Sequence, residues 1–210
     1  MMITPSSSAD YRLDFYNPDG SQSFCGNGAR CSVDFVHRFI EEKGNYLFEA
    51  IDGVHEGVWS EEAIAVSMLN VHSVQSFDDG FFCHTGSPHF MKMVDGLGSM
   101  DLIAAGREIR YDERFHPGGT NVNFLERVNE VWSMRTYERG VEDETLSCGT
   151  GATAAGLFLL RDEMPGHYEM TIETRGGQLS VLAEKTGGFE FNHVYLRGAV
   201  QHVFSGIWEI

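Results

Sequence analysis

A five-residue motif, Cys-Gly-x-Gly-Ala, occurs twice in this chain of 210 residues, beginning at Cys25 and at Cys148. A Glu-x-x-x-Gly element follows each copy at a similar distance, over residues 49–53 and 173–177. A repeat at such long spacing is typical of a gene-duplicated pair of domains rather than of a solenoid. We therefore expect two related folding units, each with one cysteine motif.

Secondary-structure patterns recur in the same order around the two motifs. After the first motif, the apolar residues Val33, Val36 and Ile40 have helical spacing, and after the second motif a helix is expected through residues 157–160. We expect the first helix to end near Lys43-Gly44, because glycine is the usual stop. Other expected elements are a turn at 17–20, a helix at 100–110, a hairpin turn at Gly176-Gly177 and strands at 11–16, 46–50, 54–59, 63–69 and 131–137. The pattern predicts an α+β fold.

Charge and hydropathy exclude several classes of partner. The formal net charge is -16, with 31 acidic against 15 basic residues, and such a field repels phosphate backbones and anionic membrane surfaces. We therefore expect neither nucleic acid nor a membrane as a partner. No apolar run approaches the length that spans a bilayer, and residues 1–10 lack a secretion signal, so we expect a cytoplasmic protein.

The four cysteines, Cys25, Cys31, Cys83 and Cys148, form no C-x-x-C pair. This spacing argues against a zinc site, and we expect no metal. In a reducing compartment the thiols are expected to be free, so each is either core filler or part of the chemistry. Cys31 lies inside the first helix and Cys83 in an apolar run, and we expect both in the core.

A cysteine just before a helix is suited to proton transfer. Unpaired backbone N–H groups and the helix dipole favour negative charge there, so we expect both motif thiols to have a lowered pKa. The glycines let the same turn hold a carboxylate with its N–H groups. Two such turns in related halves suggest stereochemical inversion, in which one thiolate removes an α-proton and the opposite thiol returns one. No lysine motif for pyridoxal phosphate is visible, and we expect no cofactor.

Each motif also has an interpretation without proton-transfer chemistry. A single cysteine before a small-residue helix is usually packing, but the duplication argues against that. The glycines over 149–156 are the starting point for a dinucleotide-binding interpretation, yet their spacing is wrong for that fingerprint and the preceding loop is acidic.

The chain resembles the diaminopimelate epimerase family at Asn17-Pro-Asp-Gly-Ser and Cys25-Gly-Asn-Gly-Ala-Arg-Cys. The likeness continues, in the family's order, through Gly86-Ser-Pro-His89, Thr120-Asn-Val-Asn-Phe124, Tyr137-Glu-Arg-Gly140 and Glu144-Thr-Leu-Ser-Cys-Gly-Thr-Gly-Ala152. The resemblance implies two pseudo-symmetric domains, each a bent mixed β-sheet wrapped around a central helix. The first would take residues 1–70 plus 199–210 and the second 71–198, with a C-terminal strand around 200–210 returning to the first.

The resemblance also implies a role for each site residue, with Cys25 and Cys148 as the acid/base pair. The carboxylate at the reacting centre would be held by Gly26, Asn27, Gly149 and Thr150. The distal amino-acid end would be recognised by Asn17, Asn121 and Arg139. His89 and Glu138 would orient the substrate amine and tune the thiols. Arginine gives bidentate carboxylate recognition, which a dicarboxylic amino acid needs at its far end.

Two features depart from the family pattern. The family has Asn before the Pro-His pair, where this chain has Ser87, a shorter ligand with one donor. The N-terminal strands, with a Gly-Asn-Asp-Phe segment, are also absent from this sequence. The first sheet is then expected to expose an edge and an apolar face. We expect the chain to be prone to self-association through this surface, for instance as a homodimer, and to have little epimerase activity.

The expected partner is a small amino acid, and the expected reaction is epimerisation of LL-diaminopimelate to the meso form. A proline or hydroxyproline racemase is a rival with the same paired cysteines, but it needs no distal carboxylate clamp. An inactive homologue that only binds a ligand is a rival of another class.

Overall fold

The computed structural model describes residues 1–17 and 20–207. The helices are α1 (Gly26–Phe39), α2 (Leu102–Arg110) and α3 (Gly149–Leu159), with short 3-10 turns at Leu97–Ser99 and Glu113–Phe115. The first strands are β1 (Met2–Thr4), β2 (Tyr11–Asp14), β3 (Asn45–Ala50), β4 (Gly53–Trp59) and β5 (Ile64–Ser67). The remaining strands are β6 (Gln75–Phe77), β7 (Gly80–His84), β8 (Pro88–Met93), β9 (Asn121–Val128), β10 (Val131–Glu138), β11 (Asp143–Thr145), β12 (Gly166–Thr174), β13 (Gly177–Gly187) and β14 (Glu190–Gly198).

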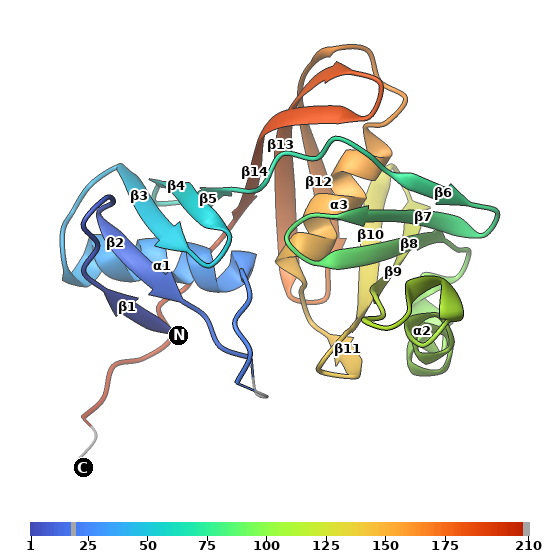
Figure 1. The fold of residues 1–210 in the computed structure, drawn as a ribbon, viewed down its shortest axis with the longest axis horizontal. Coiled ribbons are helices and arrows are strands. Elements are labelled where there is room, and N and C mark those ends of the chain that lie inside the picture. Colours follow the sequence, from blue (N-terminus) through green and yellow to red (C-terminus); the bar gives the residue numbers. More distant parts are fainter. Residues whose placement is uncertain (18–19, 208–210) are drawn as a thin grey trace.

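The elements form two lobes (Figure 1). The first lobe holds β1–β5 and α1, and the second holds β6–β14, α2 and α3. Within the described residues the strands form one continuous sheet with parallel and antiparallel pairs, so the expected mixed α+β architecture is confirmed. The lobes are joined where β5 pairs antiparallel with β14. The proposed division at residue 70 stays a prediction.

The two halves repeat the same plan. In the first lobe β2, α1, β3 and β4 follow one another, with β2 parallel to β3 and β3 antiparallel to β4. In the second lobe β10, α3, β12 and β13 have the same order and the same directions. The Glu-x-x-x-Gly elements occupy equivalent hairpins, because Glu49 pairs across the parallel ladder as Glu173 does. The repeat predicted from the sequence is therefore structural.

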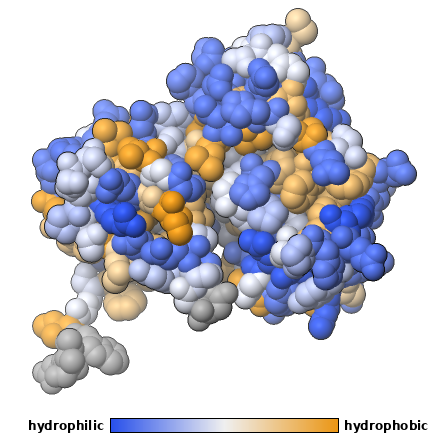
Figure 2. Space-filling view, viewed as in Figure 1, coloured by the Kyte–Doolittle hydropathy of each residue, from blue (hydrophilic) through white to orange (hydrophobic). Residues whose placement is uncertain are grey.

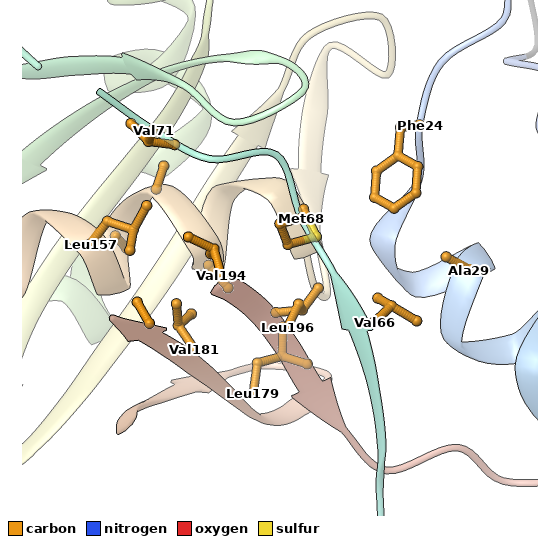
Figure 3. Packing of buried hydrophobic residues seen from close by; sticks show 14 of the residues in the cluster. Phe24, Ala29, Val66, Met68, Val71, Leu157, Leu179, Val181, Val194 and Leu196 are labelled. Carbon is orange, nitrogen blue, oxygen red and sulfur yellow. The ribbon is translucent and has the colours of Figure 1, made fainter. Parts of the chain in front are cut away.

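Burial distinguishes the two central helices. Helix α3 is buried over Gly149–Phe158 and packs on β12, β13 and β14 on one side and on β8 and β9 on another. Helix α1 has one buried face, and Phe35 and Phe39 on its other face are exposed. One apolar cluster connects the lobes through Val66 of β5 and Leu196 of β14 (Figure 3).

Two predicted features were wrong, namely the residue at which α1 ends and the strand at the C-terminus. Helix α1 ends at Phe39, before Lys43, because the hydroxyl of Tyr46 accepts from the Lys43 amide and donates to the Glu41 carbonyl, at 2.6 and 2.9 Å. The C-terminal strand is absent over residues 200–207, and residues 208–210 lie outside the described chain. The segment still passes along the first lobe, where His202 lies 5.8 Å from Phe39 between ring centroids.

The other predicted elements lie within three residues of their expected ends. Of the turn at 17–20, Pro18 and Asp19 lie outside the described residues, but the Gly20 amide donates to the Asn17 carbonyl at 2.9 Å. Apolar side chains are visible on the first lobe (Figure 2), and Leu47, Val54 and Val58 of β3 and β4 are exposed.

Candidate active site

A cleft of about 450 Å³ lies between the two lobes. It is lined by every site residue predicted from the sequence except His89, namely Asn17, Cys25, Gly26, Asn27, Ser87, Asn121, Glu138, Arg139, Cys148, Gly149 and Thr150. Residues more than 120 positions apart are thus brought to one site by the packing of the two halves.

The two cysteines have the same local structure. Each is the N-cap of a central helix with extended backbone, at φ -121° and ψ 106° for Cys25 and φ -117° and ψ 111° for Cys148. The Gly28 amide donates to the Cys25 sulfur at 3.4 Å. A sulfur at an N-cap takes the place of the usual oxygen acceptor for an orphan amide. The duplicated motif therefore places two thiols at N-caps with the same backbone conformation, and only Cys25 of the two also caps its helix through the sulfur.

The N-termini of α1 and α3 approach each other closely. The Asn27 side chain donates to the Ser147 carbonyl, just before Cys148, at 3.1 Å. A Cβ added at Gly149 would lie 3.2 Å from Asn27 Oδ1, and one added at Gly26 would lie 3.7 Å from Gly149 Cα. Both helices thus aim their free amides and positive dipole ends into the cleft, which favours a carboxylate there.

The expected lowering of both thiol pKa values is wrong. Burial raises the pKa of Cys25, against the Gly28 amide, which lowers it. Burial raises the pKa of Cys148 to about 12, with the charge of Glu138 adding to the rise, while the Thr150 hydroxyl and Gly151 amide lower it. Removal of water around a thiol disfavours its charged form more than two helix ends favour it. Both thiols are therefore protonated near neutral pH.

Two buried charges act on the thiols from opposite directions. Burial raises the pKa of Glu138, whose carboxylate raises the pKa of both Cys25 and Cys148. The guanidinium of Arg30, which is 6% exposed, lowers the pKa of Cys25 and donates to Asn27 Oδ1 at 3.0 Å. The charge balance at the sulfurs is thus set by one carboxylate and one guanidinium.

Hydrogen bonds organise the far end of the cleft. Asn121 donates to Ser87 Oγ at 2.7 Å and accepts from the Arg139 amide at 2.9 Å. The Asn17 side chain donates to Ser21 Oγ at 3.0 Å and accepts from Ser23 Oγ at 3.2 Å. Ser87 in this chain thus serves as a partner of Asn121, at the place where the family has a longer amide.

His89 lies beneath the cleft rather than in its lining. It is fully buried on β8, and its Nε2 lies 2.8 Å from Thr150 Oγ1. Burial lowers the pKa of His89 to about 3, so its ring is neutral. Its contact with the cleft runs through Thr150.

Arg110 also lines the cleft, although it was not among the site residues predicted from the sequence. Its guanidinium pairs with Glu142 at 3.0 Å, and Arg110 and Arg139 both donate to the Gly118 carbonyl, at 3.5 and 3.3 Å. Gly119 has φ +66°, and a Cβ there would overlap the Arg110 guanidinium. The Gly118-Gly119 pair was the available signal, because such a pair permits close approach of another group.

The other two cysteines differ in burial. Cys83 on β7 is in the core, as expected, whereas Cys31 is exposed because Arg30 and Val33 take the inward positions of α1. Among residues 1–17 and 20–207 no group of three or more His, Cys, Asp or Glu side chains is placed to hold a metal ion.

Solved structures share this fold. A phenazine biosynthesis protein of the PhzF family from Bacillus anthracis matches with a TM-score of 0.77 at 14% identity, over 93% of this chain and 79% of that one. A hydroxyproline epimerase from Agrobacterium vitis matches with a TM-score of 0.67 at 18% identity, over 93% of this chain and 70% of that one. The chain therefore has the two-lobed fold of these proteins, with a paired-cysteine cleft between its lobes.

Sequence relatives identify the family. The family model for diaminopimelate epimerase matches residues 81–203. The diaminopimelate epimerase of Flavobacterium psychrophilum is 38% identical over 97% of this chain and 80% of the relative. That of Chlorobaculum tepidum is 37% identical over 98% of this chain and 83% of the relative. The chain belongs to the diaminopimelate epimerase family.

Proposed function

We propose that this chain catalyses the epimerisation of LL-diaminopimelate to meso-diaminopimelate without a cofactor, with Cys25 and Cys148 as the proton carriers. One observation carries the proposal: two N-cap thiols from opposite lobes line one cleft in a member of this family. A substrate carbon between them has one sulfur on each face, so one thiolate removes the α-proton and the other thiol supplies a new one.

The converging helix ends stabilise the carbanion. Loss of the α-proton moves negative charge into the α-carboxylate, which becomes an enolate-like dianion. The free amides of Gly26, Asn27, Gly149 and Thr150 begin the two helices and lie around the same cleft. Donors fixed before the reaction stabilise developing charge without reorganisation, and burial strengthens their effect.

The substrate amine supports ionisation of a thiol. Glu138 raises the pKa of both sulfurs through its negative charge. A substrate ammonium beside Glu138 neutralises that charge and adds a positive one near the sulfurs. Substrate binding therefore shifts one thiol toward thiolate.

Specificity is assigned to the far end of the cleft. Asn17, Asn121 and Arg139 line the cleft, and the planar guanidinium of Arg139 can donate two parallel hydrogen bonds to a second carboxylate. Asparagine side chains both donate and accept, which suits an amino acid with both charges.

The reaction places the protein in lysine and peptidoglycan precursor synthesis, and we propose a cytoplasmic location. No helix within the described residues is long and apolar enough to cross a membrane. We also propose that the exposed apolar side chains of the first lobe support a homodimer.

The test is incubation with LL-diaminopimelate in heavy water, followed by mass spectrometry and chiral analysis. We expect deuterium at an α-carbon and formation of the meso isomer. L-Proline and trans-4-hydroxy-L-proline serve as competing substrates. Deuterium in these instead would favour a proline or hydroxyproline racemase, and binding without exchange of any substrate would favour an inactive homologue.

A further inference from the structure

A chain of buried polar side chains connects Cys148 to the sheet beneath the cleft. It runs from Thr136 on β10 through Asn123 on β9 and His89 on β8 to Thr150 on α3, and ends at the sulfur of Cys148. All five residues are at most 7% exposed. In such an interior each donor needs an acceptor, so the direction of every hydrogen bond can be worked out from its ends.

The orientation of the Asn123 amide is fixed by the Phe90 carbonyl. Asn123 Nδ2 lies 3.1 Å from that carbonyl oxygen, which can only accept. The Thr136 hydroxyl donates to Asn123 Oδ1 at 3.0 Å. Reversal of the amide would bring two acceptor oxygens together at Phe90, so nitrogen faces the carbonyl and oxygen faces the hydroxyl.

The Asn123 amide in turn selects one tautomer of His89. The same Asn123 Nδ2 lies 3.1 Å from His89 Nδ1, and its second hydrogen is aimed there. His89 Nδ1 must therefore accept, which leaves the proton of the neutral ring on Nε2. The neutral state agrees with the buried surroundings, which lower the pKa of His89 to about 3.

The protonated His89 Nε2 then sets the direction of the Thr150 hydroxyl. Nε2 lies 2.8 Å from Thr150 Oγ1 and donates to it, so the hydroxyl proton is available elsewhere. Cys148 Sγ lies 3.6 Å from the same oxygen. The Thr150 carbonyl accepts from Thr85 Oγ1 at 2.8 Å, which holds this turn in place.

We propose that Asn123 is a positioning residue for proton transfer: by fixing the His89 tautomer, it turns the Thr150 hydroxyl toward Cys148 and stabilises the thiolate of that cysteine. The inference rests on the proposed role of Cys148 as a proton carrier. No proton moves along the chain; each of the four groups before Cys148 donates one fixed hydrogen bond to the next group. A hydrogen bond to a charged sulfur favours its ionised form, against the burial and the Glu138 charge that oppose it.

The proposed chain of hydrogen bonds acts on Cys148 and not on Cys25. In the first motif Asn27 stands where the second has Thr150, and its side chain is bonded to the Ser147 carbonyl and to Arg30. Burial raises the pKa of Cys25, and the groups that oppose this rise are backbone amides and the Arg30 charge rather than a side-chain hydroxyl. Cys25 in the same protein therefore serves as an internal control.

The first experiment reads the tautomer directly in the unmodified chain. Protein labelled with ¹⁵N-histidine is examined by two-bond ¹H–¹⁵N correlation, and the His89→Gln variant identifies the His89 signals among the nine histidines. We expect the pattern of a neutral ring protonated at Nε2. A ring protonated at Nδ1, or at both nitrogens, overturns the proposal.

The second experiment is a double-mutant cycle of Asn123→Leu and Thr150→Val, with alkylation of each cysteine by iodoacetamide followed by mass spectrometry. Loss of a hydrogen bond to a charged group corresponds to about a tenfold fall in the Cys148 rate. We expect that fall in Asn123→Leu, and less than about a twofold further change when Asn123→Leu is added to Thr150→Val, since coupled residues are non-additive.

Cys25 should alkylate at the same rate in all four proteins. The proposal is overturned if Asn123→Leu leaves the Cys148 alkylation rate unchanged. It is also overturned if Asn123→Leu lowers that rate equally in the presence and in the absence of the Thr150 hydroxyl, or if the Cys25 alkylation rate falls in parallel. Neither experiment uses turnover, so their outcome is separate from failure of the proposed epimerase activity. If Asn123→Leu does not fold, the tautomer of the unmodified chain decides.

Discussion

The Gly149→Ala substitution tests whether the close approach of α1 and α3 builds the carboxylate site. A Cβ at this position would lie 2.8 Å from Leu196 Cδ2, 3.2 Å from Asn27 Oδ1 and 3.4 Å from Asn27 N. Leu196 is fully buried, and Asn27 is held by the Ser147 carbonyl. The added methyl group must therefore displace the Leu196 side chain or shift the N-terminus of α3 from its place beside Asn27.

The size of the effect follows from these distances. Ordinary carbon contacts begin at about 3.5 Å, so the contact with Leu196 Cδ2 needs a displacement of about 0.7 Å. Overpacking of this kind costs about 1–3 kcal/mol of unfolding free energy, which lowers Tm by about 2–12 °C for a chain of this size. Misplacement of catalytic donors by about 1 Å lowers the rate by about 100-fold. For this smaller displacement we expect kcat/KM to fall by about 10- to 100-fold.

Activity and stability are measured side by side. The deuterium-exchange assay gives kcat/KM for LL-diaminopimelate, and circular dichroism gives Tm. Gly44→Ala is the matched control, because no atom lies within 4 Å of a Cβ added there. If Gly149→Ala keeps kcat/KM within about threefold of the Gly44→Ala value, the helix ends do not form the donor set and the reasoning is refuted.

Three further predictions concern the thiols and the distal end. Cys25→Ala and Cys148→Ala should each abolish epimerisation, because each face needs its own proton carrier; chiral analysis showing near-normal turnover in either would contradict this. Arg139→Met should lower kcat/KM for diaminopimelate by an amount equivalent to about 1.5–3 kcal/mol, since a carboxylate loses its charge-assisted partner; an unchanged value would show that Arg139 does not hold the distal carboxylate. The raised pKa of Cys148 contributes stability below about pH 8.5 that is lost as pH rises toward 12, because the unfolded thiol ionises first. Urea unfolding should therefore show that the unfolding free energy falls less between pH 7.5 and 10 in Cys148→Ala than in the unchanged chain. Equal falls in the two proteins would contradict the raised pKa of Cys148.

Local sequence was sufficient for the elements whose ends are locally determined. Helix α2 begins after Asp101, whose carboxylate accepts from the Ala104 amide at 3.1 Å, and the predicted helix differs from it by two residues. The predicted stop of α1 was wrong because the strand that follows the helix supplies the stop: the hydroxyl of Tyr46 on β3 bonds to the Lys43 amide and the Glu41 carbonyl, which would otherwise continue the helix. A glycine is a usual stop signal, but it is not needed where a side chain ends the helix first.

The sequence by itself determined the two thiol sites. An N-cap cysteine followed by glycines is a local device, and its duplication predicted a shared cleft, which the packing of the lobes provides. Asn17, Asn121 and Arg139, which were expected at the site from the resemblance to the family, line the same cleft.

Only the tertiary structure decided the electrostatics of those groups. The pKa of a thiol depends on how much water and which charges surround it, and those neighbours come from the other lobe and from Glu138. The burial of His89 beneath Thr150 depends on the register of β8 against β9, which no residue pattern in either strand specifies. The motifs therefore determine which groups carry the chemistry, and long-range packing determines their charge states, because desolvation is a property of the assembled interior.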